Sequence, residues 1–329
     1  MMNNDLSRRR FLAVTPLAAL GLMLERHPFL SSLGLNKPDS KFGGVQMGAI
    51  TYSFRSMPHD IDQLLKFCVD CNVSAIEMMG DPAETYAGKP ASPFQMGPPP
   101  QGGFTEEQKA ARAAYGKKVV EWRATASMDK FKDIRKKFKK AGVSIYAFKP
   151  NAFNANNTDA EIEYGLKAAK ALGAKSVTVE LPTDAAQSKR LGDLGAKHKM
   201  YIGYHAHLQA TDTLWDVALG QSPYNSLNLD CGHYIAAKGN TKETLLALIE
   251  AKHDRITSMH IKDRTTAANG SKNLEWGKGD TPIKEILSLL KTKKYKFPAT
   301  VELEYDIPQG SDAVKEVKKC LEFAKAILV

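Results

Sequence analysis

Apolar runs of strand length recur along the chain, and amphipathic runs with a helical period separate them. The apolar runs begin at residues 45, 74, 143, 174, 199, 227, 256 and 298. The segments between them repeat apolar residues at helical spacing, as in DAEIEYGLKAAKAL and PIKEILSLLK. Near-continuous apolar strands that alternate with helices are typical of a parallel sheet covered by helices. Eight repeats of this unit predict an α/β fold, a (β/α)8 TIM barrel, as a single domain over residues 41–329.

Two connections are longer than the plain barrel requires. Residues 81 to about 127 follow the second apolar run and contain GKPASPFQMGPPPQGGF, whose Pro and Gly content excludes regular structure until TEEQKAARAAYGKKVVEW predicts a helix. RTTAANGSKNLEWGKGD follows the seventh run. Both connections leave the C-terminal ends of strands, the barrel face where active sites lie. We expect the first insertion to form a wall or lid over that face.

Charged and imidazole side chains collect where the predicted strands end. They are Glu77, Glu180, His205, His207, Asp230, His233, His260, Lys262, Glu302 and Glu304. Strand residues alternate sides, and the odd-offset neighbours Tyr204, Ile261 and Leu303 are apolar, so the polar set is predicted to face the barrel interior.

Imidazole and carboxylate groups from several strands predict a site for one divalent metal ion, with Mn, Co, Zn, Fe and Mg all compatible. A single buried histidine is more often a hydrogen-bonded core residue, so this prediction depends on the whole set. Burying that many charges without a cation would cost several kcal/mol per ion.

The series VTVEL, YHAH, LDCGHY, MHIKD and VELEYD, together with WGKGD, resembles the sugar isomerase/epimerase family with a xylose isomerase-like TIM barrel. That family also includes inosose dehydratases, tagatose epimerases and apurinic-site endonucleases, and the resemblance covers about residues 45–325. It implies one divalent ion held by His205, Asp230, His260 and Glu302. Many members carry Glu near position 205, so Glu180 is an alternative fourth ligand.

The resemblance also implies a chemistry. A metal that chelates a carbonyl oxygen and the adjacent hydroxyl allows the α-proton to leave, because the enediolate charge is stabilised. Glu302 or Glu180 would take the proton. The remaining strand-end groups would hold sugar oxygens; they are the catalytic candidates Lys262 and His233, and Glu77, His207, Arg264 and Glu304 as substrate-binding residues. Reprotonation gives an epimerase or an isomerase, and loss of a β-leaving group gives a lyase or dehydratase, with a 3-keto-glycoside as one candidate substrate. The sequence leaves these outcomes open.

Two other functions are compatible with parts of this sequence. The net charge is +10, and much of the excess lies in DKFKDIRKKFKK, residues 129–140, where an apolar stripe predicts a solvated Lys face on a packed helix. The two Phe side chains of that segment belong to the apolar stripe and Arg135 is its single Arg. Residues 265–280 lack the His that a trinuclear zinc endonuclease needs, so we expect no nucleic-acid partner. A sugar-binding barrel without catalysis is the second alternative, but the ligand set is complete. The oligomeric state stays open.

The N-terminal segment SRRRFLAVTPLAALGLML resembles a twin-arginine export signal, with a basic tail as the alternative. We expect residues 1–40 to be a signal and linker, the protein to be periplasmic, and the apolar stretch to be too short for a stable membrane span. The cleavage position stays open. Export favours an unphosphorylated sugar or glycoside, because sugar phosphates are cytoplasmic metabolites. The four cysteines show no disulfide framework and are predicted to lie in the core.

Overall fold

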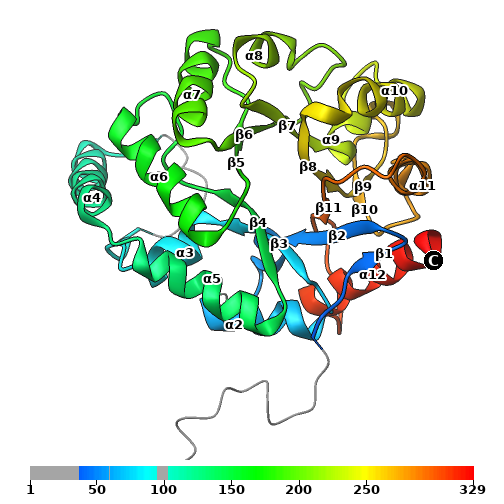
Figure 1. Ribbon diagram of the computed structural model, residues 1–329, viewed down its shortest axis with the longest axis horizontal. Helices are drawn as coiled ribbons and strands as arrows, with labels where there is room; N and C mark the ends of the chain where they lie inside the picture. The colour runs from blue at the N-terminus through cyan, green and yellow to red at the C-terminus, as the bar shows by residue number, and fades with distance from the viewer. Residues whose placement is uncertain (1–36, 59, 95–102) are drawn as a thin grey trace, which may run out of the picture. The chain divides into compact units, whose positions relative to one another are not determined.

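The computed structural model describes residues 37–58, 60–94 and 103–329. Within them, eight parallel strands close into a barrel, because the first, β2, pairs with both β3 and β11 (Figure 1). The predicted TIM barrel is therefore confirmed. The barrel strands are β2 (Val45–Ile50), β3 (Ala75–Met79), β4 (Ser144–Lys149), β5 (Ser176–Glu180), β6 (Tyr201–His205), β7 (Asn225–Asp230), β8 (Ile256–Ile261) and β11 (Ala299–Val301).

Helices surround the barrel and cover the outer face of its sheet (Figure 1). They are α2 (Ile61–Asp70), α3 (Gly80–Tyr86), α4 (Glu106–Thr125), α5 (Asp129–Ala141), α6 (Asp159–Leu172), α7 (Ala185–His198), α8 (Asp216–Gln221), α9 (Cys231–Ala236), α10 (Lys242–Lys252), α11 (Ile283–Lys293) and α12 (Ala313–Leu328). Local sequence sets their ends. Thr158 caps α6 in a capping box with Glu161, and Gly173 ends the same helix in the left-handed conformation.

Short elements complete the chain. The strand β1 (Lys41–Phe42) pairs antiparallel with β2, and β9 (Asp263–Arg264) pairs with β10 (Asn273–Leu274) in the long connection after β8. The 3-10 helices are η1 (Thr51–Phe54), η2 (His253–Arg255) and η3 (Ala267–Asn269).

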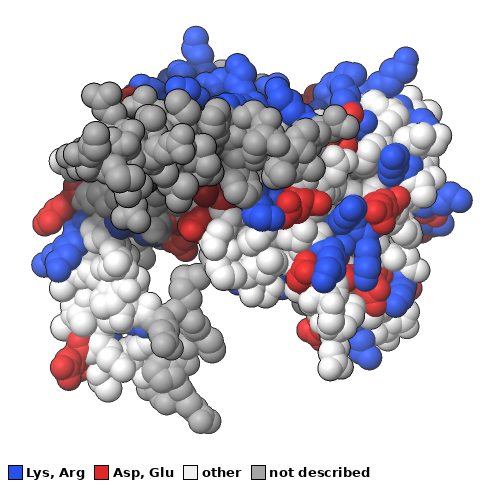
Figure 2. Space-filling model, turned by 90° about the horizontal axis from the view of Figure 1, so that it is seen from below, with Lys and Arg blue, Asp and Glu red and all other residues white. Residues whose placement is uncertain are grey.

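The core lies mainly between the barrel strands and the helices. On α5 the predicted apolar stripe is buried, including Phe131, Ile134 and Phe138, while its lysines are exposed. All four cysteines are buried and free, as expected for core residues. In the view of Figure 2, Lys and Arg side chains gather along the upper edge, and on the right-hand side they are interspersed with Asp and Glu.

Three features differ from the expectations. Helix α3 occupies the start of the insertion, and the short helices α8 and α9 follow β6 and β7, where no helix was predicted. Strand β11 ends at Val301, so Glu302 and Glu304 lie just beyond the strand that the apolar pattern extended to Tyr305. The predicted signal and linker fall almost entirely outside the described residues. Among those that are described, every helix is too short or too polar to cross a bilayer.

Candidate metal centre and active site

Four buried side chains from four neighbouring strand ends bring nitrogen and oxygen atoms together at the barrel mouth. They are His205 on β6, Asp230 on β7, His260 on β8 and Glu302 directly after β11. Asp230 Oδ2 lies 3.9 Å from His205 Nε2 and 3.8 Å from His260 Nδ1. His260 Nδ1 lies 3.1 Å from Glu302 Oε2. Ligands about 2.1 Å from a shared ion lie roughly 3 to 4 Å from one another. The ligand atoms of His205, Asp230 and His260 all lie within 4.8 Å of one another and could hold one divalent cation, and Glu302 adjoins this group through His260.

A buried asparagine orients the first imidazole. His205 Nδ1 lies 2.9 Å from Asn228 Oδ1, which assigns the ring proton to Nδ1 and leaves the Nε2 lone pair facing the other ligand atoms. Burial, followed by the charge on His260, lowers the pKa of His205 to about 4. His205 is therefore a neutral imidazole at pH 7, the form that binds metal.

Glu77 orients the second imidazole, that of His260. Its Oε2 lies 2.9 Å from His260 Nε2, and its Oε1 accepts a hydrogen bond from Thr178 Oγ1 at 2.6 Å. Glu77 is fully buried, so it supports His260 in the way that carboxylates support metal-bound histidines. This position differs from the substrate-binding role that the sequence suggested, because neighbouring side chains engage both carboxylate oxygens.

A helix cap and a close side-chain approach account for the residues of the segment Asp-Cys-Gly-His. Asp230 Oδ1 accepts a hydrogen bond from the backbone N–H of His233 at 2.7 Å and caps α9. Among the described residues, Asp230 Oδ2 has no hydrogen-bond partner, although Lys262 Nζ lies 3.0 Å away. A Cβ on Gly232 would approach Lys262 Cγ to 2.3 Å, so any larger residue at this position would clash with the lysine.

Lys262 adds a second cationic group to the cluster. Its Nζ lies 2.6 Å from Glu302 Oε2 and 2.7 Å from Glu304 Oε2. Burial opposes the charged form, but Asp230 and Glu302 outweigh it and raise the pKa of Lys262. Burial likewise opposes protonation of His260, and the carboxylates of Glu302 and Glu77 raise its pKa to about 10. Without a metal ion these two cations offset part of the buried negative charge that the sequence argument had assigned to an ion alone, and His260 would have to lose a ring proton to bind one. The case for the ion therefore depends on the geometry of the His205, Asp230 and His260 atoms.

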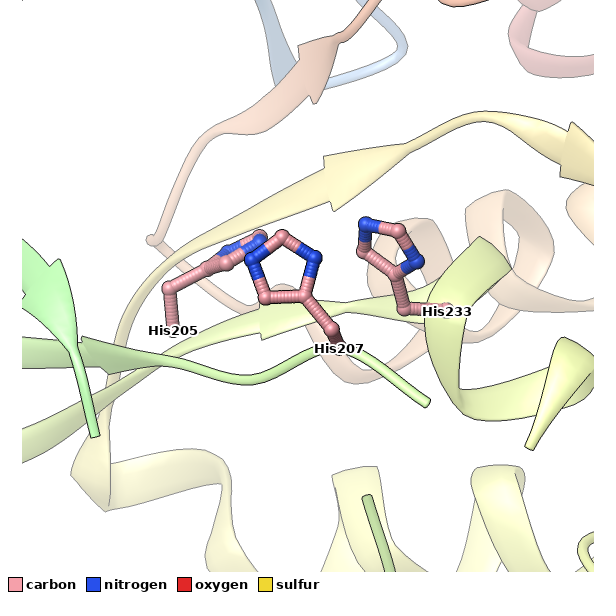
Figure 3. Close-up of side chains that lie close together, drawn as sticks. All are labelled: His205, His207 and His233. Atoms are coloured by element: carbon pink, nitrogen blue, oxygen red, sulfur yellow. The ribbon is translucent and has the colours of Figure 1, made fainter. Parts of the chain in front are cut away.

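A second group of close nitrogen atoms belongs to His205, His207 and His233 (Figure 3). Lys262 Nζ lies 3.0 Å from His233 Nε2, and Arg264 Nη1 lies 2.5 Å from His233 Nδ1. A further cation here would face two charged side chains at short range. Burial and then the charge of Lys262 lower the pKa of His233 to about 3. This group is better suited to hold oxygen atoms of a ligand than a metal ion.

Glu180 does not join the ligand atoms. It is half exposed, with Oε1 2.8 Å from Lys149 Nζ and Oε2 3.0 Å from His207 Nε2. The geometry thus favours His205 over Glu180 as the fourth ligand, against the alternative that the family resemblance kept open. The hydrogen bond to Glu180 raises the pKa of His207. Lys149 was not among the predicted residues, although it ends an apolar run with a charge as the other candidates do.

Asp263 fixes the connection that follows β8. Its Oδ2 accepts hydrogen bonds from the backbone N–H groups of Gly277 at 2.7 Å and Gly279 at 3.0 Å. Arg264 is anchored nearby through Nη2 to the carbonyl of Ser271 at 2.5 Å. The glycine-rich WGKGD segment is therefore tied to the strand end, which holds Arg264 against His233.

The family model described as xylose isomerase-like TIM barrel matches residues 109–327. The chain therefore belongs to the xylose isomerase-like TIM barrel family, and the predicted family is confirmed. No sequence among curated proteins matches significantly.

Several solved structures share the fold. One is the IolI protein with a bound zinc atom, at 16% identity and TM-score 0.58, covering 87% of this chain and 99% of that one. The probable 3-DHS dehydratase AsbF from Bacillus anthracis has 14% identity and TM-score 0.58, covering 84% and 98%. The 3-keto-D-glucoside 4-epimerase YcjR from E. coli has 12% identity and TM-score 0.56, covering 86% and 99%. At these identities the likeness shows the fold alone.

Proposed function

We propose that this chain is a divalent-metal-dependent carbohydrate isomerase or epimerase that removes the proton next to a carbonyl of an unphosphorylated sugar. The observation that carries the proposal is the group of ligand atoms from His205, Asp230 and His260, whose separations suit one ion, with Glu302 beside His260. Family membership supports it. So do the zinc in the IolI structure and the epimerase activity named for YcjR.

A divalent ion in this group would polarise a substrate carbonyl and stabilise the charge that develops on its oxygen. The Lys262 ammonium, buried beside the ligands, can donate a hydrogen bond to a neighbouring substrate oxygen. Neutral His233 and the Arg264 guanidinium can hold further hydroxyls. These side chains come from the ends of β7 and β8, so the strands fix their positions relative to the ligands.

Two sets of groups at the barrel mouth can transfer protons, one directly after β11 and the other at the ends of β5 and β6. Burial opposes ionisation of Glu302, but His260 and Lys262 lower its pKa well below the usual value, so its carboxylate is charged. Its position beside the metal group makes it the candidate proton acceptor. In the other set, the Glu180–His207 pair can return a proton. Two such groups on different sides of a substrate suit inversion at a carbon atom.

The decisive experiment measures metal content and exchange of the α-hydrogen together. Purified protein reconstituted with Mn, Co, Zn or Mg should hold one ion per chain and should catalyse exchange of solvent deuterium into a keto-sugar or a 3-keto-glycoside. All reaction outcomes considered share this step, and the isolated product then identifies isomerase, epimerase or lyase. A stoichiometry well below one ion per chain would favour a sugar-binding protein. Stoichiometric metal without exchange on any sugar of the panel would overturn the enzymatic proposal.

We also propose that the protein is exported, which is the reason to screen unphosphorylated sugars first. The support is the order of Ser7, Arg8, Arg9 and Phe11 before an apolar stretch. Replacing Arg8 and Arg9 by Lys keeps the charge of the segment and should retain the protein in the cytoplasm. Equal periplasmic fractions for the wild-type and Lys-Lys chains would contradict this.

A further inference from the structure

A cavity of about 730 Å³ lies beside the metal group, over the ends of β2, β3 and β4. Its volume falls within the range of small-molecule sites, about 300–1,000 Å³. The insertion after β3 builds much of it, and the lining includes Pro90 and Tyr115 from the insertion and Tyr52 from η1. The Tyr115 hydroxyl donates a hydrogen bond to the carbonyl of Pro90 at 3.0 Å, which fixes the ring against the wall.

Buried polar groups form another part of the lining. The Arg123 side chain is only 7% exposed, with Nη1 2.8 Å from Glu161 Oε1 and Nη2 3.0 Å from the carbonyl of Asn151. Asn151 Nδ2 in turn donates to Asp81 Oδ1 at 2.9 Å. Among the described residues, Arg123 Nε has no hydrogen-bond partner. Such a rigid array of donors and acceptors is suited to hydroxyl groups.

Of the three cations among the described residues that line this cavity, two are neutralised by carboxylates. Asp81 pairs with Lys89, and Glu84 and Glu161 lie within 4.0 Å of Lys89 or Arg123. The third cation, Arg55, donates to backbone carbonyls and lies over the Tyr52 ring. Tyrosine walls and a polar lining whose charges are largely engaged fit a hydroxylated ring.

The cavity approaches the metal group at one edge. Arg55 Nη1 donates to the carbonyl of Leu303 at 2.6 Å, and Leu303 separates Glu302 from Glu304. At another edge, Asn151 also lines a neighbouring cavity that includes Glu180, the partner of His207 outside the metal group. A ligand that starts at the metal group can therefore extend along the barrel mouth into this cavity.

We infer that this cavity is the subsite for a second, unreacting pyranose ring, so that the substrate is a disaccharide-type glycoside and not a free monosaccharide. The inference rests on the proposed function, since the reacting ring is the one held at the metal group. Tyr52 and Tyr115 contact the apolar faces of the second ring, and Asp81, Arg123 and Asn151 bind its hydroxyls.

The test compares binding of one and two rings by calorimetric titration of the metal-loaded protein. The probes are trehalose, cellobiose, maltose and gentiobiose, with glucose and glucose 6-phosphate as references. At least one disaccharide should bind roughly 10-fold more tightly than glucose. Tyr115→Ala and Asp81→Asn should each bring this affinity ratio close to one. Lys118→Ala, an exposed change on the same helix, should leave it as in the wild type.

Three results would overturn the inference: equal affinity for glucose and every disaccharide, an affinity ratio that survives both cavity variants, or tighter binding of glucose 6-phosphate than of every disaccharide. These results are separable from failure of the proposed function. Absence of α-hydrogen exchange with all keto-sugars, alongside disaccharide binding that depends on Tyr115, would remove the reaction and keep the subsite. Exchange without any preference for two rings would do the reverse.

Discussion

The two halves of the barrel mouth are built in different ways. From β6 to β11 the polar side chains stand at strand ends, so the barrel register fixes their spacing, and Asp230 pairs directly with His260. From β2 to β4 the polar side chains come from connections, and Arg123 and Asn151 meet across 28 residues of chain. The rigid half suits chemistry that needs sub-ångström placement, and the connection half suits selection of the substrate. Substitutions in the two halves should therefore have different effects.

The largest effect is expected from Glu302→Gln. The change keeps the shape of the side chain and removes the charge 3.1 Å from His260 Nδ1, which eliminates both a ligand and the proton acceptor. We expect exchange of the α-hydrogen to fall by about 10³-fold or more, with an unaltered circular dichroism spectrum. Near-normal exchange in this variant would remove Glu302 from the mechanism.

Lys262→Met should change two quantities in opposite directions. The ammonium lies 3.0 Å from Asp230 Oδ2 and 2.6 Å from Glu302 Oε2, so it competes with a cation for the same oxygens. Without it, metal affinity should rise by about 10-fold, because a like charge is removed. Turnover should fall by about 100-fold, because a donor to the substrate is lost. Metal titration and steady-state rates separate the two, and weaker metal binding would show that Lys262 supports the ion.

A smaller effect is expected from Asn228→Ala, which touches no ligand atom but removes the partner of His205 Nδ1. Metal affinity should fall by roughly 10- to 100-fold, the usual cost of losing such a supporting hydrogen bond. Ser226→Ala is the matched control, since Ser226 is buried on the same strand and bonds to the carbonyl of Ile202. Equal metal affinities in the two variants would mean that Asn228 does not orient the imidazole.

The sequence predicted side-chain positions best within β-strands, where side chains alternate between the two faces. The apolar run into Asp230 predicted its place at the mouth, and the same period places Asn228 on the same side, two residues earlier in LNLD. That signal for Asn228 was present and was not used. The role of Glu77 could not be read in this way, because its depth in the barrel depends on how far neighbouring strands are staggered.

Other features depend on contacts between residues that are far apart in the chain, and a single sequence does not show these contacts. Glu180 lies opposite His205 in the parallel ladder, yet its carboxylate turns to Lys149 and His207. The cavity beside the metal group was hidden for the same reason, because Asp81 and Asn151 are 70 residues apart and meet only in the folded chain. The insertion was recognised as a wall, but its helix α3 was not, since a seven-residue helix is too short for a clear period.

The smallest effects should come from two helix caps that match in sequence but not in surroundings. Thr105 begins α4 and Thr158 begins α6, each with a capping box whose loss costs about 1 kcal/mol. Helix α6 is buried along one face, so Thr158→Ala should lower the global free energy of unfolding by that amount. Only Val119 and Arg123 of α4 are buried, so Thr105→Ala should instead speed amide hydrogen exchange in the first turns of α4. A global loss of equal size in both variants would show that the connection half of the mouth is as firmly coupled to the barrel as the strand ends are.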